Sequence, residues 1–160
     1  MHLDAAFDLT DQNGQRRTLA DFKGKAVILL FGYTHCPDVC PTTLAEISLA
    51  LQQLGPDAAQ VQVLFITLDP ERDSQDILAR YVPSFNPTFL GLRGNAASTA
   101  DIAKKLKVFY QKHEMPGHAG YTLDHSASSY VIDPEGNLRL MVNYGFGREA
   151  LVHDLKLLLH

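Results

Sequence analysis

The sequence predicts an α/β fold in which helices cover a central sheet, and two observations carry that prediction. Continuous apolar runs at residues 26–31 and 61–68 are typical of strands buried on both faces of a sheet. Each run is followed by a segment with apolar residues at three- and four-residue spacing, the pattern of an amphipathic helix. Strands that alternate with helices in this way are expected to run parallel, because parallel pairs need crossover connections.

A β-hairpin and a helix flank the first buried strand. Segments 7–10 and 17–19 surround Asn13-Gly14, a dipeptide typical of a hairpin turn. Behind the strand at 26–31, a helix is predicted to end at Gly55-Pro56. The apolar stripe of this helix consists of Leu44, Ile47, Leu51 and Leu54.

Two more helices are predicted in the middle of the chain. The first follows the strand at 61–68, has Asp73 as its cap, and carries apolar residues at positions 77, 78, 81 and 82. After a short strand at 89–92, the second is predicted over residues 98–112. Its apolar residues at helical spacing are Ile102, Leu106, Phe109 and Tyr110.

The end of the chain is predicted to form a hairpin and a last helix. Strands at 129–133 and 138–144 are joined by the turn residues 134–137, so they run antiparallel, and an amphipathic helix covers 151–159. This order of elements is that of a thioredoxin-like fold, a central mixed sheet flanked by helices, here with an N-terminal β-hairpin. Its crossovers are expected to be right-handed.

Length and composition favour one domain over residues 1–160, since 46% of the residues are hydrophobic. A net charge of -4 without a basic block argues against binding to nucleic acid or to a membrane surface. No apolar run approaches the roughly 20 residues of a membrane span. The first residues lack a signal-peptide pattern, which leaves either a cytosolic protein or one trimmed of its targeting segment.

The chain has two cysteines, Cys36 and Cys40. Two are too few for a disulfide scaffold, and a closed zinc site made of cysteines alone needs four. Their close spacing favours redox chemistry or metal binding, and the alternative is two buried residues without a chemical role. Residues 32–43 join the first buried strand to its helix, at the sheet edge where open α/β folds bind ligands.

The spacing of the pair suits both chemistries. Side chains four residues apart on a helical turn share a face, with Cα atoms roughly 6 Å apart, within disulfide range. A helix N-terminus lowers the pKa of a thiol and so supplies thiolate. Pro41 is expected to kink the first turn, so that the regular helix begins at Thr43, which has capping-box spacing to Glu46.

A thiolate pair favours Cu(I), and a third ligand would complete the site. The best candidate is His125, because it precedes an antiparallel strand that starts at the edge where the parallel strands end. The alternative is a loop histidine without a role. Asp69, at the end of the strand at 61–68, is a candidate to orient a ligand, with turn chemistry as its alternative.

His35 and three residues of a predicted loop can also bind metal. His35 adjoins Cys36 and is expected to point to solvent rather than to bind. His113, Met115 and His118 lie in a predicted loop over residues 113–120, and a loop that contains Gly and Pro collects such residues readily.

Three separated motifs resemble the Sco/SenC family of copper chaperones. They are GYTHCPDVCP at residues 32–41, DPERD at 69–73 and LDHS at 123–126. The resemblance covers nearly the whole chain, with the motifs in the right order. It implies a thioredoxin fold that binds one copper ion per chain, as Cu(I) or Cu(II), through Cys36, Cys40 and His125.

The resemblance also implies delivery of copper to the binuclear copper site of cytochrome c oxidase, or reduction of the cysteines of that site. The implied partners are the copper-site subunit of the oxidase and another copper chaperone, and we expect a monomer. Family members are usually tethered on the outer face of a bacterial inner membrane or in the mitochondrial intermembrane space. We therefore expect the periplasmic side of a bacterial inner membrane, with an anchor outside this segment.

Two other functions fit the cysteine pair and leave open whether the protein is an enzyme. A thiol–disulfide oxidoreductase would cycle Cys36 and Cys40 between dithiol and disulfide without metal. A thiol peroxidase shares the fold, but its nucleophile would need neither Cys40 nor His125. His125 distinguishes the copper chaperone from the thiol–disulfide oxidoreductase, because copper binding requires His125 and plain disulfide exchange does not.

Overall fold

The computed structural model describes residues 6–34, 39–114, 121–125, 128–143 and 147–160. Backbone alone is described for residues 39–40, 112–114, 121–125, 128 and 143. Within the described parts of the chain, no helix combines the length and the hydropathy that crossing a membrane requires.

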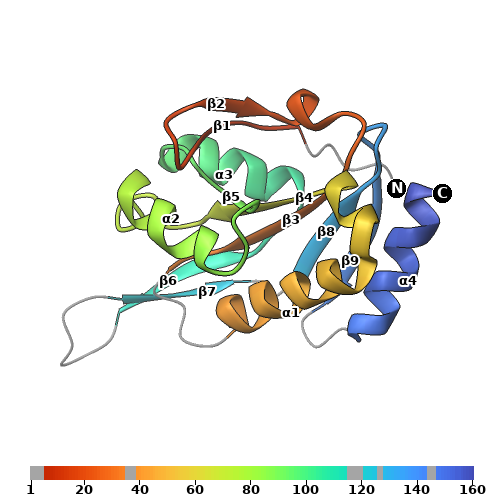
Figure 1. Ribbon diagram of the computed structural model, residues 1–160. Helices are drawn as coiled ribbons and strands as arrows, with labels where there is room; N and C mark the ends of the chain where they lie inside the picture. Colours follow the sequence, from red (N-terminus) through yellow and green to blue (C-terminus); the bar gives the residue numbers. More distant parts are fainter. Residues whose placement is uncertain (1–5, 35–38, 115–120, 126–127, 144–146) are drawn as a thin grey trace.

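A seven-stranded mixed sheet forms the centre of the molecule (Figure 1). The neighbours β3 (Ala26–Gly32), β4 (Val61–Thr67) and β5 (Leu90–Arg93) run parallel, and the remaining pairs of this sheet are antiparallel. The sheet confirms the predicted thioredoxin-like α/β fold, including its N-terminal hairpin. In spatial order its strands are β2 (Arg16–Thr18), β1 (Asp8–Asp11), β5 (Leu90–Arg93), β4 (Val61–Thr67), β3 (Ala26–Gly32), β8 (Ser128–Ile132) and β9 (Leu138–Asn143).

Among the described residues, four α-helices pack on the sheet: α1 (Val39–Leu54), α2 (Gln75–Tyr81), α3 (Ala96–Lys105) and α4 (Arg148–Leu159). The same parts of the chain contain three short 3-10 segments, Leu19–Phe22, Gly55–Gln60 and Val82–Ser84. Buried residues of α3 share one hydrophobic cluster with one face of the sheet, and those of α1, α2 and α4 share a second cluster with the other face.

The central strand β3 contributes to both clusters because successive side chains of a strand point to opposite faces. Val27, Leu29 and Phe31 lie in the cluster with α3, whereas Ile28 and Leu30 lie in the cluster with α1. Every residue of β3 is buried. The continuous apolar run therefore reflects a strand covered on both sides, as predicted.

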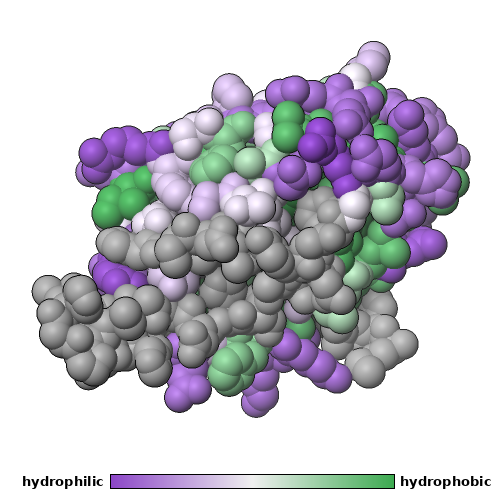
Figure 2. Space-filling model, turned by 90° about the horizontal axis from the view of Figure 1, so that it is seen from below, coloured by the Kyte–Doolittle hydropathy of each residue, from purple (hydrophilic) through white to green (hydrophobic). Residues whose placement is uncertain are grey.

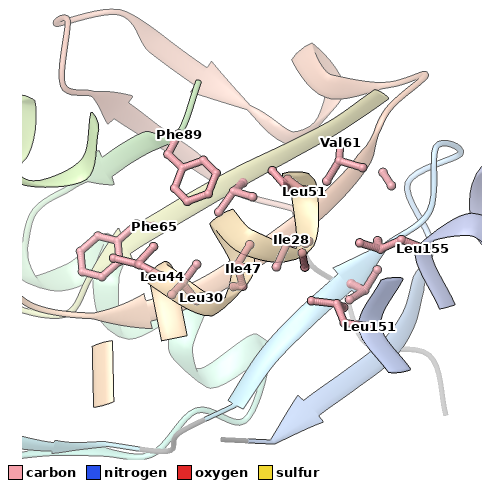
Figure 3. Packing of buried hydrophobic residues seen from close by; sticks show 14 of the residues in the cluster. Ile28, Leu30, Leu44, Ile47, Leu51, Val61, Phe65, Phe89, Leu151 and Leu155 are labelled. Carbon is pink, nitrogen blue, oxygen red and sulfur yellow. The ribbon is translucent and has the colours of Figure 1, made fainter. Parts of the chain in front are cut away.

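The apolar stripe of α1 packs as the sequence predicts (Figure 3). Leu44, Ile47 and Leu51 belong to the same cluster as Ile28 and Leu30 of β3. Leu44 and Ile47 have no exposed surface. This packing fixes the helix over the sheet and thereby fixes where its first turn lies.

The predicted helix over residues 98–112 is wrong in its second half. The helix α3 ends at Lys105, and residues 110–114 form strand β6, which pairs with β7 (Tyr121–His125) as a separate two-stranded sheet. Lys107 adopts φ +58, and the N–H of Val108 donates to the carbonyl of Ala103 at 2.8 Å. This is a Schellman stop, in which the left-handed position is occupied by lysine instead of the usual glycine.

Two smaller predictions about helix starts are also wrong. The first helix begins at Val39 rather than at Thr43. Pro41 is tolerated there because it lies in the first turn, where N–H groups have no partner within the helix. The cap of α2 is Ser74, whose hydroxyl accepts from the N–H of Ile77 at 3.3 Å, and Asp73 has other partners, described below.

Candidate metal centre

One edge of the sheet collects the segments that the sequence singles out. The parallel strands β3 and β4 end there at Gly32 and Thr67. Strand β8 starts at the same edge, because it runs antiparallel to β3 and Ser129 pairs with Leu30. We call this region, defined by Gly32, Thr67 and Ser128, the carboxyl edge. In Figure 1, β3 and β4 run toward the left of the view, and Figure 2 shows the molecule from below.

The backbones of two predicted ligands flank the carboxyl edge. Cys40 is the second residue of α1, the helix that follows β3. His125 is the last residue of β7, three positions before Ser128. Three Cα–Cα steps span at most roughly 11 Å, so the chain holds His125 close to the start of β8. Cys36 lies outside the described residues.

The β6–β7 hairpin separates His125 from His113. Tyr110 pairs with His125, and His113 pairs with Thr122. His113 is three residues farther along β6 than Tyr110, which corresponds to roughly 10 Å of strand. Its position in β6 replaces the predicted loop, whereas Met115, His118 and His35 lie outside the described residues.

Asp69 is buried just beyond the end of β4. Its carboxylate forms an ion pair with the guanidinium of Arg72, which also lies 5.7 Å from the ring centroid of Tyr33. The N–H of Asp69 donates to the hydroxyl of Thr67 at 2.9 Å. Asp69 therefore has the turn chemistry that the sequence analysis weighed, and its action on a metal ligand remains a prediction.

The residue that sequence reasoning assigned incorrectly is Asp73. It is fully buried, and its carboxylate accepts hydrogen bonds from Thr34 and Thr67. Thr34 follows the end of β3, and Thr67 is the last residue of β4. Its place in the DPERD motif was visible in the sequence. The partner Thr34 lies 39 residues earlier, so no local pattern indicates the contact.

Among the side chains that the structure describes, no three His, Cys, Asp or Glu residues converge in an arrangement that would hold a metal ion. The predicted ligands are placed by backbone alone or lie outside the description. The donor set predicted from the sequence has two thiolates and one imidazole. Such a set would fit copper, since thiolates favour Cu(I) and imidazole suits Cu(II).

Known proteins resemble the chain over most of its length. The SCO1/SenC family model matches residues 1–160. The chain belongs to the SCO1/SenC family. Among curated members, the mitochondrial SCO2 homologue of Bos taurus is 42% identical over 132 residues, which are 81% of this chain and 50% of that protein. The human SCO2 homologue is 40% identical over 151 residues, 93% of this chain and 55% of that protein. The chain spans about half the length of these curated relatives.

Solved structures of SCO1/SenC proteins share the fold closely. Bradyrhizobium japonicum ScoI with copper bound has a TM-score of 0.89 and 41% identity, covering 98% of this chain and 99% of that one. Yeast Sco1 with copper bound has a TM-score of 0.86 and 33% identity, covering 98% and 87%. Copper is thus bound by two relatives that share this fold over nearly all of the present chain.

Proposed function

We propose that residues 1–160 form one copper-binding domain that carries a single copper ion through Cys36, Cys40 and His125. The observation that carries the proposal is topological. The strand β3 leads into the helix that contains Cys40, and the antiparallel strand β8 starts beside the end of β3, three residues after His125. Copper bound to ScoI and to yeast Sco1, relatives with the same fold, supports copper as the metal.

Each proposed ligand has a distinct part in this chemistry. The two cysteines supply thiolates, and the start of α1 favours the deprotonated form because the helix N-terminus carries partial positive charge. Both cysteines lie in residues 32–43, the segment here called the cysteine turn. His125 supplies an imidazole from a separate element, so its contribution depends on the fold rather than on the cysteine turn. Asp69 is proposed to orient a ligand from outside the donor set.

The proposed target is the binuclear copper site of cytochrome c oxidase. The resemblance of the three sequence motifs to the Sco/SenC family, which implies this target, supports the proposal. We propose that the domain, acting as a monomer, delivers copper to the oxidase subunit that holds this site, after receiving it from another copper chaperone. The proposed location is the periplasmic side of a bacterial inner membrane.

A second candidate function uses the same cysteines without metal. The Cys36 and Cys40 dithiol would transfer two electrons and two protons to a disulfide of the target, leaving a Cys36–Cys40 disulfide and a target dithiol. The spacing of the cysteines at a helix start favours this reaction as well. Copper binding and disulfide exchange exclude each other at one moment, since a disulfide removes both thiolates.

A copper titration of the reduced protein under anaerobic conditions tests the proposal. We expect one Cu(I) per chain in competition with a Cu(I) chelator, and a loss of affinity of at least a hundredfold in Cys36→Ala and in Cys40→Ala. Oxidation to the disulfide should abolish the same binding. Tight one-to-one binding that survives in both single variants would contradict the assignment of the cysteines.

The assignment of His125 needs titrations in both oxidation states. We expect His125→Ala to weaken Cu(II) binding much more than Cu(I) binding, because imidazole suits Cu(II) and thiolates suit Cu(I). The matched control replaces His113, Met115 and His118 together and should leave both affinities nearly unchanged. If the control variant loses Cu(II) while His125→Ala retains it, the third ligand has been assigned to the wrong residue.

A further inference from the structure

The carboxylate of Asp73 accepts three hydrogen bonds near the carboxyl edge. It has no exposed surface. One carboxylate oxygen accepts from the hydroxyl of Thr34 at 2.5 Å, and the other accepts from the N–H of Thr34 at 3.0 Å and from the hydroxyl of Thr67 at 2.6 Å. A carboxylate that accepts three hydrogen bonds without access to water is fixed in position.

The backbone around Asp73 is held as firmly as its side chain. The N–H of Asp73 donates to the carbonyl of Asp69 at 2.9 Å, which closes the turn after β4. From β5, the side chain of Arg93 donates to the carbonyl of Asp73 at 3.0 Å and to that of Pro70 at 2.8 Å. The carboxylate of Asp73 is therefore presented to Thr34 by a turn anchored on two strands.

The partners of Asp73 stand next to the proposed copper site in the sequence. Thr34 is two residues before Cys36, and Thr67 is two residues before Asp69. We propose that Asp73 is a positioning residue for the cysteine turn, which it fixes at Thr34 so that the turn leaves β3 in one direction.

A fixed starting point matters for both reactions of the cysteine pair. Two thiolates bind one ion tightly only if they lose little conformational freedom when they come together. A site whose supporting residues already hold the thiolates in place meets that condition. Disulfide formation has the same requirement, because it depends on the effective concentration of one thiol at the other. A looser turn should therefore weaken copper binding and favour the dithiol over the disulfide.

The test compares Asp73→Asn with Asp133→Asn. Asp133 is a matched control because it is also a nearly buried aspartate that accepts backbone hydrogen bonds, in the turn after β8. That turn lies at the opposite end of β3, since Ile132 pairs with Val27. Seven residues of strand, roughly 20 Å, separate the two ends.

Two readouts are measured for each variant and for wild type, at a temperature well below the midpoint of thermal unfolding. One is the Cu(I) affinity of the reduced protein, measured by chelator competition, and this readout alone rests on the proposed function. The other is the equilibrium of the Cys36–Cys40 disulfide with dithiothreitol, which gives protein dithiol and oxidised dithiothreitol. We expect Asp73→Asn to weaken Cu(I) binding about tenfold and to shift the second equilibrium about tenfold toward the dithiol, which is about 30 mV for a two-electron couple. Asp133→Asn should leave both within twofold of wild type.

The possible outcomes are distinct. Equal readouts in Asp73→Asn and wild type overturn the positioning role, as does an Asp133→Asn variant that shifts both readouts to the same extent. A wild type that binds no Cu(I) overturns the proposed function, while the dithiothreitol equilibrium still decides the role of Asp73. Thr34→Val removes only one of the three hydrogen bonds and keeps the backbone N–H, so it carries the test if Asp73→Asn does not fold. It should shift both readouts in the same direction by a smaller factor.

Discussion

Buried aspartates organise two kinds of region in this molecule, the hairpin turns and the carboxyl edge. At the hairpins, Asp11 and Asp133 use the same pattern of bonds. One carboxylate oxygen of Asp11 accepts from the N–H groups of Asn13 and Gln15 at 2.8 and 3.0 Å. That of Asp133 accepts from the N–H groups two and four residues later at 3.0 and 2.9 Å. In each turn the other oxygen pairs with an arginine six residues later.

Asp73 at the carboxyl edge is satisfied by distant partners instead. Its carboxylate joins the segment after β3 to the end of β4, and the partner Thr34 is 39 residues away in the sequence. The hairpin aspartates stabilise turns that their own neighbours largely define, whereas Asp73 connects elements that meet only in the folded chain. Local hydrogen bonds thus stabilise the hairpin turns, whereas long-range hydrogen bonds connect the strand ends in the region proposed to bind copper.

The largest expected difference between the two regions is in stability after removal of the carboxylate. Asp73→Ala removes the acceptor of three hydrogen bonds at a residue with no exposed surface, and we expect it to lower the free energy of unfolding by about 3 kcal/mol or more. Asp133→Ala should cost about 2 kcal/mol, because water reaches its turn more easily. Urea unfolding of both apo variants measures the difference, and equal costs would contradict a difference in stability between the two regions.

The second expected effect is a pH dependence at the hairpins. Burial acts to raise the pKa of Asp11, but hydrogen bonds from Arg17, Gln15 and Asn13 outweigh it, and the pKa lies below its ordinary value of 3.8. The unfolded chain therefore takes up the proton first, so the stabilisation is complete above about pH 5 and is lost as the pH falls through the folded-state pKa. Asp11→Asn should cost about 2 kcal/mol at pH 7 and progressively less toward pH 3.

Thermal unfolding of Asp11→Asn and wild type from pH 7 to pH 3 measures this loss. Asp133→Asn provides a parallel case, since burial raises its pKa and the hydrogen bonds from Asn137, Arg139 and Glu135 lower it to a net value below 3.8. Unfolding curves of variant and wild type that stay equally far apart at all pH values would show that these carboxylates do not contribute through their charge.

The same contrast explains how much of the fold the sequence predicts. The hairpin at Asn13-Gly14 and the buried strands were predicted correctly, because turn chemistry and apolar runs are local properties. The error over residues 98–112 has a local cause of another kind. Leu106, Phe109 and Tyr110 continue the helical spacing, while the helix stops through the left-handed backbone of Lys107, a position where glycine would have given a signal.

The carboxyl edge was predictable only in part. The position of His125 before a strand antiparallel to β3 followed from the order of elements, and its backbone lies there. The role of Asp73 did not follow, because a residue five positions past Leu68 in a DPERD segment resembles a helix cap until its partner Thr34 is known. Contacts between residues far apart in the sequence require the fold before they can be identified.

A third, smaller effect concerns the glycine of the second hairpin turn. Gly136 has φ +93, and a Cβ there would meet no atom within 4 Å, so the cost of a side chain is backbone strain alone. We expect Gly136→Ala to lower the free energy of unfolding by about 1 kcal/mol. Gly136→Asn should cost less, because asparagine tolerates positive φ better. Equal costs for the two variants in urea unfolding would contradict this explanation.

The smallest expected effect distinguishes the two hairpins from each other. The guanidinium of Arg17 lies 2.8 Å from Asp11 with 29% of the side chain exposed, whereas that of Arg139 lies 3.3 Å from Asp133 with 57% exposed. Because the guanidinium of Arg139 is largely exposed and lies farther from its partner, water screens this pair, so Arg139→Gln should change the free energy of unfolding by less than about 0.5 kcal/mol. Arg17→Gln should cost about 1 kcal/mol, because its partner carboxylate has no exposed surface and loses a charged donor. Urea unfolding at low and high salt checks both values, and a greater cost for Arg139→Gln would mean that burial of the aspartate does not set the strength of these pairs.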